Sequence, residues 1–130
     1  MGRKKRILIV TDGTEKVKKM AEDIALTLKE NSVLIKDTQS FQGTDLLPAE
    51  VLFFGCEKPS PPSFHYVEAL LQHINLASRS LGVFSPNSKT AAQYLVRMAK
   101  DCDAVINQAP LFTENAGEIK LWAAQVLSGK

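Results

Sequence analysis

The chain has 130 residues, of which 45% are hydrophobic and 23% charged, a composition that excludes a disordered or collagen-like protein. The length is typical of one domain, so we expect residues 1–130 to form a single domain, and no apolar run approaches the roughly 18–20 residues that cross a bilayer. The net charge is +2, and four of the sixteen basic residues stand together at positions 3–6. Because only four apolar residues follow this basic stretch and the rest of the chain is nearly neutral, we expect a cytoplasmic protein that binds neither nucleic acid nor a membrane.

The first half of the chain alternates short apolar runs with a helical pattern. Residues 7–10 form a short apolar run rich in β-branched side chains, which predicts a strand buried on both faces of a sheet. Residues 32–36, with Val33, Leu34 and Ile35, are a second candidate strand. Between them, a 3.6-residue period predicts a helix of about four turns. Its apolar face consists of Val17, Met20, Ala21, Ile24, Ala25 and Leu28. A polar connection, residues 37–50, has room for one short helical turn, and residues 51–55 predict the third strand.

The second half repeats the alternation. Three prolines in residues 56–62 exclude regular structure there, and Ser63 is the expected N-cap of the helix that follows. The apolar face of this helix consists of Phe64, Val67, Leu70, Leu71 and Ile74. Residues 80–85 predict a fourth strand, Ser88 the start of another helix, and residues 104–107 a short fifth strand. The last helix, from about Asn115, carries Trp122 on its apolar face, which predicts that Trp122 packs in the core.

Alternation of strands and helices predicts a parallel sheet with helices on both faces, that is, a three-layer α/β sandwich. Strand residues buried on both faces should then include Ile9, Val10, Leu52, Phe53, Val83, Phe84 and Ile106. Such sheets bind ligands beyond the carboxyl ends of their strands. This rule selects residues 11–14, 56–62 and 85–88, with residues 108–113 at the edge.

The first of these segments contains two hydroxyls and a glycine between a buried strand and a helix start. Thr11, Gly13 and Thr14 suit a phosphate site, because a helix N-terminus offers free N–H groups and glycine allows close approach. Asp12 favours the other interpretation, in which Thr11 or Asp12 caps the helix, because a carboxylate repels phosphate. The residues alone leave both interpretations open.

Three segments together resemble flavodoxins: Val-Leu-Phe-Phe-Gly at 51–55 before a proline-rich loop, Leu-Gly-Val-Phe-Ser at 81–85 before a turn and a helix, and Thr-Glu-Lys-Val at 14–17, similar to the end of a flavodoxin phosphate loop. The resemblance covers nearly the whole chain in order and spacing. It implies a five-stranded parallel sheet in the order 2-1-3-4-5, non-covalent binding of FMN, and electron transfer with a redox partner protein. The cofactor contacts it implies are Thr11, Asp12, Gly13, Thr14, Cys56, Glu57, Lys58, Ser85, Pro86 and Asn87.

Departures from the flavodoxin pattern leave the function open. The segment 11–14 is about two residues shorter than the family's phosphate loop, and residues 56–62 contain no aromatic side chain to lie against a flavin. We therefore expect weak FMN binding at a degenerate site. The alternatives are a flavodoxin-fold domain that has lost FMN and acts in protein interaction or regulation, and a weak phosphate- or nucleotide-binding domain.

The remaining reactive side chains predict no independent catalytic site, so at most a redox carrier is expected. Cys56 ends a central strand without a histidine nearby in the sequence, and we expect a small buried thiol. His65 and His73 are eight residues apart on one predicted helix, which is not the spacing of a metal-binding pair.

Overall fold

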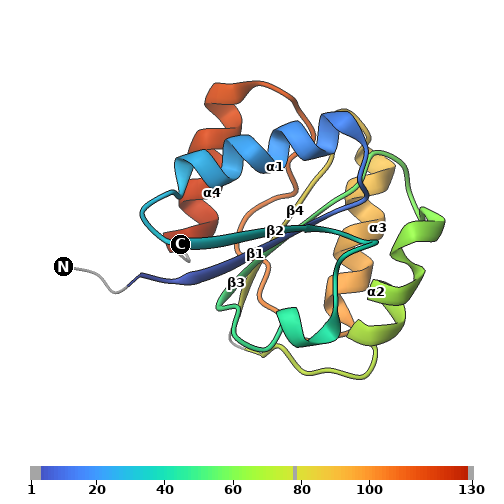
Figure 1. Ribbon diagram of the computed structural model, residues 1–130. Coiled ribbons are helices and arrows are strands. Elements are labelled where there is room, and N and C mark those ends of the chain that lie inside the picture. Colours follow the sequence, from blue (N-terminus) through green and yellow to red (C-terminus); the bar gives the residue numbers. More distant parts are fainter. Residues whose placement is uncertain (1–3, 78, 129–130) are drawn as a thin grey trace.

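The computed structural model describes residues 4–77 and 79–128 of the chain (Figure 1). Its strands are β1 (Arg6–Thr11), β2 (Ser32–Asp37), β3 (Val51–Gly55) and β4 (Ser80–Phe84). Its helices are α1 (Glu15–Thr27), α2 (His65–Leu71), α3 (Lys89–Lys100) and α4 (Ala116–Ser128), with two 3-10 turns, η1 (Gly43–Asp45) and η2 (Pro62–Phe64). The predicted alternation of strands and helices is confirmed as far as β4.

The strands form a parallel sheet in the order β2-β1-β3-β4. On β1, which lies between β2 and β3, Ile9 is opposite Ile35 on β2 and opposite Phe53 on β3. Helices α1 and α4 cover one face of the sheet and α2 and α3 cover the other (Figure 1). The predicted three-layer α/β sandwich is therefore confirmed.

The predicted fifth strand at residues 104–107 is wrong. Within the described residues the sheet has four strands, and the chain beyond β4 pairs with its edge as two isolated bridges, Ser80 with Val105 and Phe84 with Leu111, rather than as a strand. Six residue steps separate Val105 from Leu111 but only four separate Ser80 from Phe84, so two extra residues push the edge segment out of register. Pro110 also has no N–H to donate. Ile106, predicted to be buried, is consequently only half-buried.

The start of the second helix also differs from the prediction. Ser63 is not its N-cap: Pro61 leads into η2, and α2 follows from His65 to Leu71, so Ile74 lies beyond the helix. Proline fixes φ at a value that suits the first position of a helical turn, which explains why the turn begins at Pro62. Phe64 is fully buried in this turn, as the apolar pattern predicted.

Each face of the sheet carries its own hydrophobic core, because alternate strand residues point to opposite faces. On the α1/α4 side, Ile7, Ile9 and Phe53 pack against helix residues that include Trp122, which is 7% exposed. On the α2/α3 side, Leu8, Val10, Leu52, Phe54, Leu81 and Val83 pack against Phe64, Val67, Leu95 and Met98. Of the strand residues predicted to be buried, all except Ile106 are.

Two glycines permit close packing on the α1/α4 side. A Cβ on Gly55, at the end of β3, would lie 2.3 Å from the ring of Phe84, and a Cβ on Gly82 would lie 3.0 Å from the ring of Trp122. The ring of Trp122 meets those of Phe53 and Phe84 edge to face, at centroid distances of 5.5 and 6.2 Å. The missing side chains of these glycines thus let an aromatic cluster sit directly on β3 and β4.

Candidate functional site

The loops after β1 and β3 enclose a hollow at the carboxyl edge, the edge of the sheet where the parallel strands end. We call residues 11–14 the first loop, residues 56–62 the second and residues 85–88 the third. The hollow has a volume of about 330 Å³ and is lined by Asp12, Thr14, Glu57, Lys58, Pro61 and Ser63. This volume is at the lower end of the range for small-molecule sites, roughly 300–1,000 Å³.

Asp12 joins the two loops that form the hollow. One oxygen of its carboxylate accepts hydrogen bonds from the backbone N–H of Thr14, at 3.0 Å, and from the Thr14 hydroxyl, at 2.7 Å. The other oxygen accepts the backbone N–H of Glu57 in the second loop, at 2.8 Å. Since β1 and β3 are neighbours in the sheet, the contact spans two adjacent strand ends that are far apart in the sequence.

The start of α1 has no side-chain cap. Thr14 is the N-cap residue, but its side chain accepts no hydrogen bond from the helix, because the hydroxyl is turned towards Asp12. Gly13 stands at φ +85°, a conformation that side chains disfavour, and its N–H donates to the Thr11 hydroxyl at 3.3 Å. The interpretation in which Thr11 or Asp12 caps the helix is therefore wrong. The Thr11 hydroxyl accepts the N–H of Gly13 and the Asp12 carboxylate accepts the N–H of Thr14, and both donors precede the first residue of α1.

The second loop begins with a thiol that the fold buries completely, as predicted. Burial, and secondarily the charge of Asp12, raises the pKa of Cys56 from 9.0 to about 12. The thiol is therefore neutral at physiological pH, and a neutral thiol is a poor nucleophile. Of the three residues predicted in the second loop, Glu57 and Lys58 line the hollow and Cys56 does not. Glu57 is partly buried and Lys58 is exposed.

The third loop closes on itself and does not line the hollow. Ser85 is buried and its hydroxyl accepts the N–H of Ser88, while the Ser88 hydroxyl caps α3 by accepting the N–H of Ala91 at 3.1 Å. Pro86 is buried and Asn87 is exposed. The structure thus brings the first two predicted loops together but leaves Ser85, Pro86 and Asn87 outside the hollow that they share.

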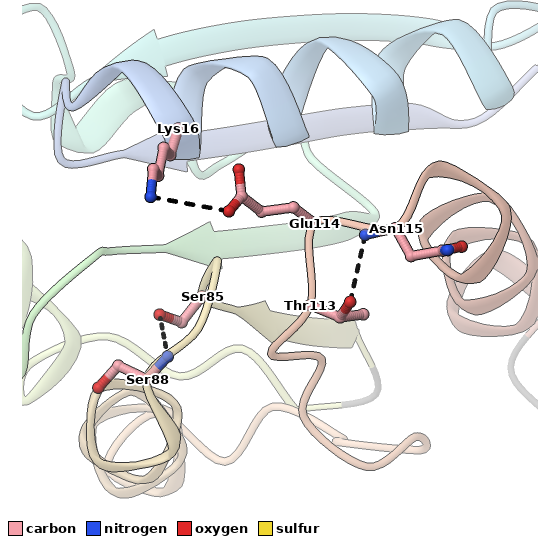
Figure 2. A network of polar contacts seen from close by, with 6 residues as sticks. All are labelled: Lys16, Ser85, Ser88, Thr113, Glu114 and Asn115. Carbon is pink, nitrogen blue, oxygen red and sulfur yellow. Dashed lines mark hydrogen bonds and ion pairs between the residues drawn. The ribbon is translucent and has the colours of Figure 1, made fainter.

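A fourth segment, which leads from the sheet edge to α4, approaches the start of α1. Figure 2 shows Glu114 reaching the Lys16 ammonium of α1, at 3.8 Å, while the Thr113 hydroxyl accepts the N–H of Asn115. Phe112, in the same segment, is 48% exposed and follows the bridge between Leu111 and Phe84. No pattern in the sequence indicated these contacts, because they depend on the path of an irregular segment.

Tyr94 does not reach the hollow. Its ring is nearly buried between α3 and α2, where its hydroxyl donates to the Glu68 carboxylate at 2.8 Å. Burial and this carboxylate raise the pKa of Tyr94 well above its ordinary value. No aromatic side chain lines the hollow in the part of the chain that the structure describes.

The residues of the first loop do not fit the phosphate group of FMN. A phosphate loop offers several free N–H and O–H donors, but the Thr14 N–H, the Thr14 hydroxyl and the Glu57 N–H all bind Asp12. A phosphate at this loop would also lie beside the carboxylate charge. The size of the hollow, in contrast, is adequate for part of a ring system.

Residues 4–77 and 79–128 contain neither a candidate metal site nor a candidate membrane-spanning helix. No group of three or more histidine, cysteine, aspartate or glutamate side chains is placed to hold a metal ion in these ranges. No helix in the same ranges is long and apolar enough to cross a bilayer.

Comparison with known proteins gives a match in structure but not in sequence. Neither a model of a protein family nor a curated protein sequence matches this chain. Flavodoxin 2 from Bacillus cereus superposes with a TM-score of 0.85 at 16% identity, covering 96% of this chain and 99% of its own. A flavodoxin from Streptococcus pneumoniae TIGR4 gives 0.84 at 13% identity, with coverages of 96% and 99%. A Fusobacterium nucleatum flavodoxin bound to flavin mononucleotide gives 0.74 at 13% identity, with coverages of 95% and 98%.

These superpositions show that the chain has the flavodoxin fold. They extend over nearly the whole of each flavodoxin, so the resemblance seen in the sequence is confirmed at the level of the fold. At such low identity they do not transfer the flavin site residue by residue, and the function has to be argued from the loops.

Proposed function

We propose that this chain is a single-domain, flavodoxin-like electron-transfer protein that binds a flavin in the hollow between the first and second loops. The observation that carries the proposal is the position of the hollow. The sheet order β2-β1-β3-β4 changes direction between β1 and β3, and α/β sheets of this kind bind ligands at that point. The hollow is formed by the loops after those two strands.

The chemistry of such a protein resides in its cofactor. A bound flavin supplies the redox reaction, and the chain supplies binding and orientation and contacts a redox partner protein. FMN is the flavin to test first, because a flavodoxin of the same fold is described with it. We expect weak FMN binding, since the donors of the first loop are bound to Asp12.

Visible absorption of the purified protein and a fluorescence titration with FMN test the proposal. We expect a Kd of about 1 μM or weaker for FMN. A Ser63→Trp variant, which fills the hollow from its rim, should abolish binding, whereas Gln125→Trp on the exposed surface of α4 should not change it. The proposal is wrong if the protein binds no flavin, or if both variants bind flavin as tightly as the parent.

One observation favours a second candidate, a flavodoxin-fold protein that acts in protein interaction without a flavin. The first and second loops are joined directly by the hydrogen bond between Asp12 and Glu57. In addition, large apolar side chains are exposed on β2 and in the connection after it. These are Leu34, Ile35 and Leu47. A colourless protein that binds no flavin would leave this candidate as the better account.

A further inference from the structure

The start of α1 combines an uncapped helix end with a carboxylate of the chain itself. The N-cap side chain accepts no hydrogen bond from the N–H groups of the helix, and such an end carries a partial positive charge. The Asp12 carboxylate lies directly before it and accepts hydrogen bonds from three donors of Thr14 and Glu57, two residues that line the hollow. An internal carboxylate thus does at this loop what the oxygens of an anionic ligand would do.

The surrounding charges make the same place unfavourable for a second anion. Asp12 and Glu57 line the hollow together with a single cation, Lys58. The other nearby cation, Lys16, lies against Glu114 (Figure 2). Glu15 adds another carboxylate in the first turn of α1. A dianionic phosphate would therefore meet more negative than positive charge around the first loop.

We propose that Asp12 occupies the phosphate position of this fold and makes the site selective for a flavin without a phosphate, such as riboflavin. The proposal rests on the flavin-binding function proposed above and specifies its ligand. Asp12 acts in two ways: it removes the donors of Thr14 and Glu57 from a ligand, and it repels a phosphate by its charge. The uncharged ring and ribityl chain of riboflavin meet neither obstacle.

A paired titration with riboflavin and FMN tests this selectivity. The parent should bind riboflavin about tenfold more tightly than FMN, because two like charges at contact distance in a partly solvated site cost about that much. Asp12→Asn should remove or reverse the preference, since an amide is uncharged and has one acceptor oxygen instead of two. A parent that prefers FMN would overturn the proposal.

Asp37 provides the matched control. It ends the neighbouring strand β2, and its carboxylate likewise accepts backbone N–H groups of its own turn, from Gln39 at 3.0 Å and Ser40 at 2.9 Å. It lies beside the first loop, where a Cβ on Gly13 would be 4.0 Å from the Asp37 Cβ, but it does not line the hollow and accepts no hydrogen bond from Thr14 or Glu57. Asp37→Asn changes the net charge by the same amount and should keep the riboflavin preference of the parent. An equal shift in both variants would mean a general charge effect and would overturn the proposal.

Inorganic phosphate separates this proposal from the proposed function. Asp12→Asn and Asp12→Ser should both be stabilised against thermal unfolding by millimolar phosphate, while the parent and Asp37→Asn should not. If no flavin binds any variant but phosphate stabilises only the Asp12 variants, the flavin function fails and the role of Asp12 stands. If phosphate stabilises the parent as much as either Asp12 variant, the role of Asp12 fails.

Discussion

The junctions β1–α1 and β4–α3 have the same local plan, a buried strand followed by a turn and a helix at the carboxyl edge, but they are held in different ways. At β4–α3, Ser88 caps the helix and Ser85 accepts the N–H of Ser88, so the turn is closed by its own residues. At β1–α1, the hydroxyl of the N-cap residue Thr14 donates a hydrogen bond to Asp12, and Asp12 also accepts the N–H of Glu57 in another loop.

This difference separates a structural turn from the loop that we propose as a binding loop. A local hydroxyl cap takes up one of the free N–H groups at the helix end and holds the turn with its own residues. A carboxylate shared between two loops leaves the helix end uncapped and makes the shape of the hollow depend on one charged side chain. Substitutions at β1–α1 should therefore change ligand selectivity as well as stability, whereas those at β4–α3 should change stability alone.

The largest expected effect concerns Cys56, which follows β3 between the two junctions. Its pKa of about 12, against an ordinary 9.0, should slow alkylation at pH 8 about a thousandfold relative to a free thiol. Because folding raises this pKa, the thiol favours the folded state below pH 9 and loses that contribution as the pH rises towards 12. Alkylation rates in a Cys102→Ala background test this; rapid labelling of the folded protein at pH 8 would contradict it.

Gly55→Ala should destabilise the fold by about 3 kcal/mol. The new Cβ would lie 2.3 Å from the ring of Phe84, so the end of β3 or the ring that leads into the third loop must move. Chemical denaturation measures the loss. Adding Phe84→Leu should recover part of it, because a smaller side chain relieves the contact; no coupling between the two substitutions would show that the ring moves freely.

The two junctions can be compared directly with Asp12→Ala and Ser88→Ala. Asp12→Ala leaves the Glu57 N–H and the Thr14 donors without their acceptor and should cost about 2 kcal/mol, whereas loss of the Ser88 cap should cost about 1 kcal/mol. Only the first should alter flavin or phosphate binding. Equal effects on binding would remove the distinction between the junctions.

The smallest effect is expected for the ion pair that ties the fourth segment to α1. Lys16 and Glu114 are about half exposed, with nitrogen and oxygen 3.8 Å apart, so Glu114→Gln should change stability by less than about 0.5 kcal/mol. Thermal unfolding at low and high salt checks this value. A larger loss at low salt would mean that the segment around Glu114 is held by this pair rather than by Leu111 and α4.

Local patterns predicted most of the fold. The runs that became β1 to β4 and the apolar faces of α1, α3 and α4 depend on periodicity, which a sequence displays directly. The edge segment was mispredicted because the apolar run at 104–107 does not reveal that two extra residues and Pro110 break its register with β4.

The sequence predicted that the first and second loops share the carboxyl edge, but individual contacts in the candidate site were predictable only within a loop. Asp12 and Thr14 are close in the sequence, and their contact follows from the short polar turn before α1. The contact between Asp12 and Glu57 follows instead from the register of β1 beside β3, which no local pattern contains. The hydrogen bond from Tyr94 to Glu68 on another helix was likewise outside what a local pattern shows.

Amide hydrogen exchange at Glu57 tests the central claim, that the Asp12 carboxylate joins the first and second loops, most directly. In the parent, the Glu57 N–H should be protected, because it donates to Asp12 at 2.8 Å. In Asp12→Ala its exchange should accelerate about tenfold or more, since a lost hydrogen bond of this kind is worth at least about 1.4 kcal/mol. The Ala91 N–H, held by Ser88, should keep its rate. Fast exchange at Glu57 in the parent, or an unchanged rate in the variant, would contradict the account.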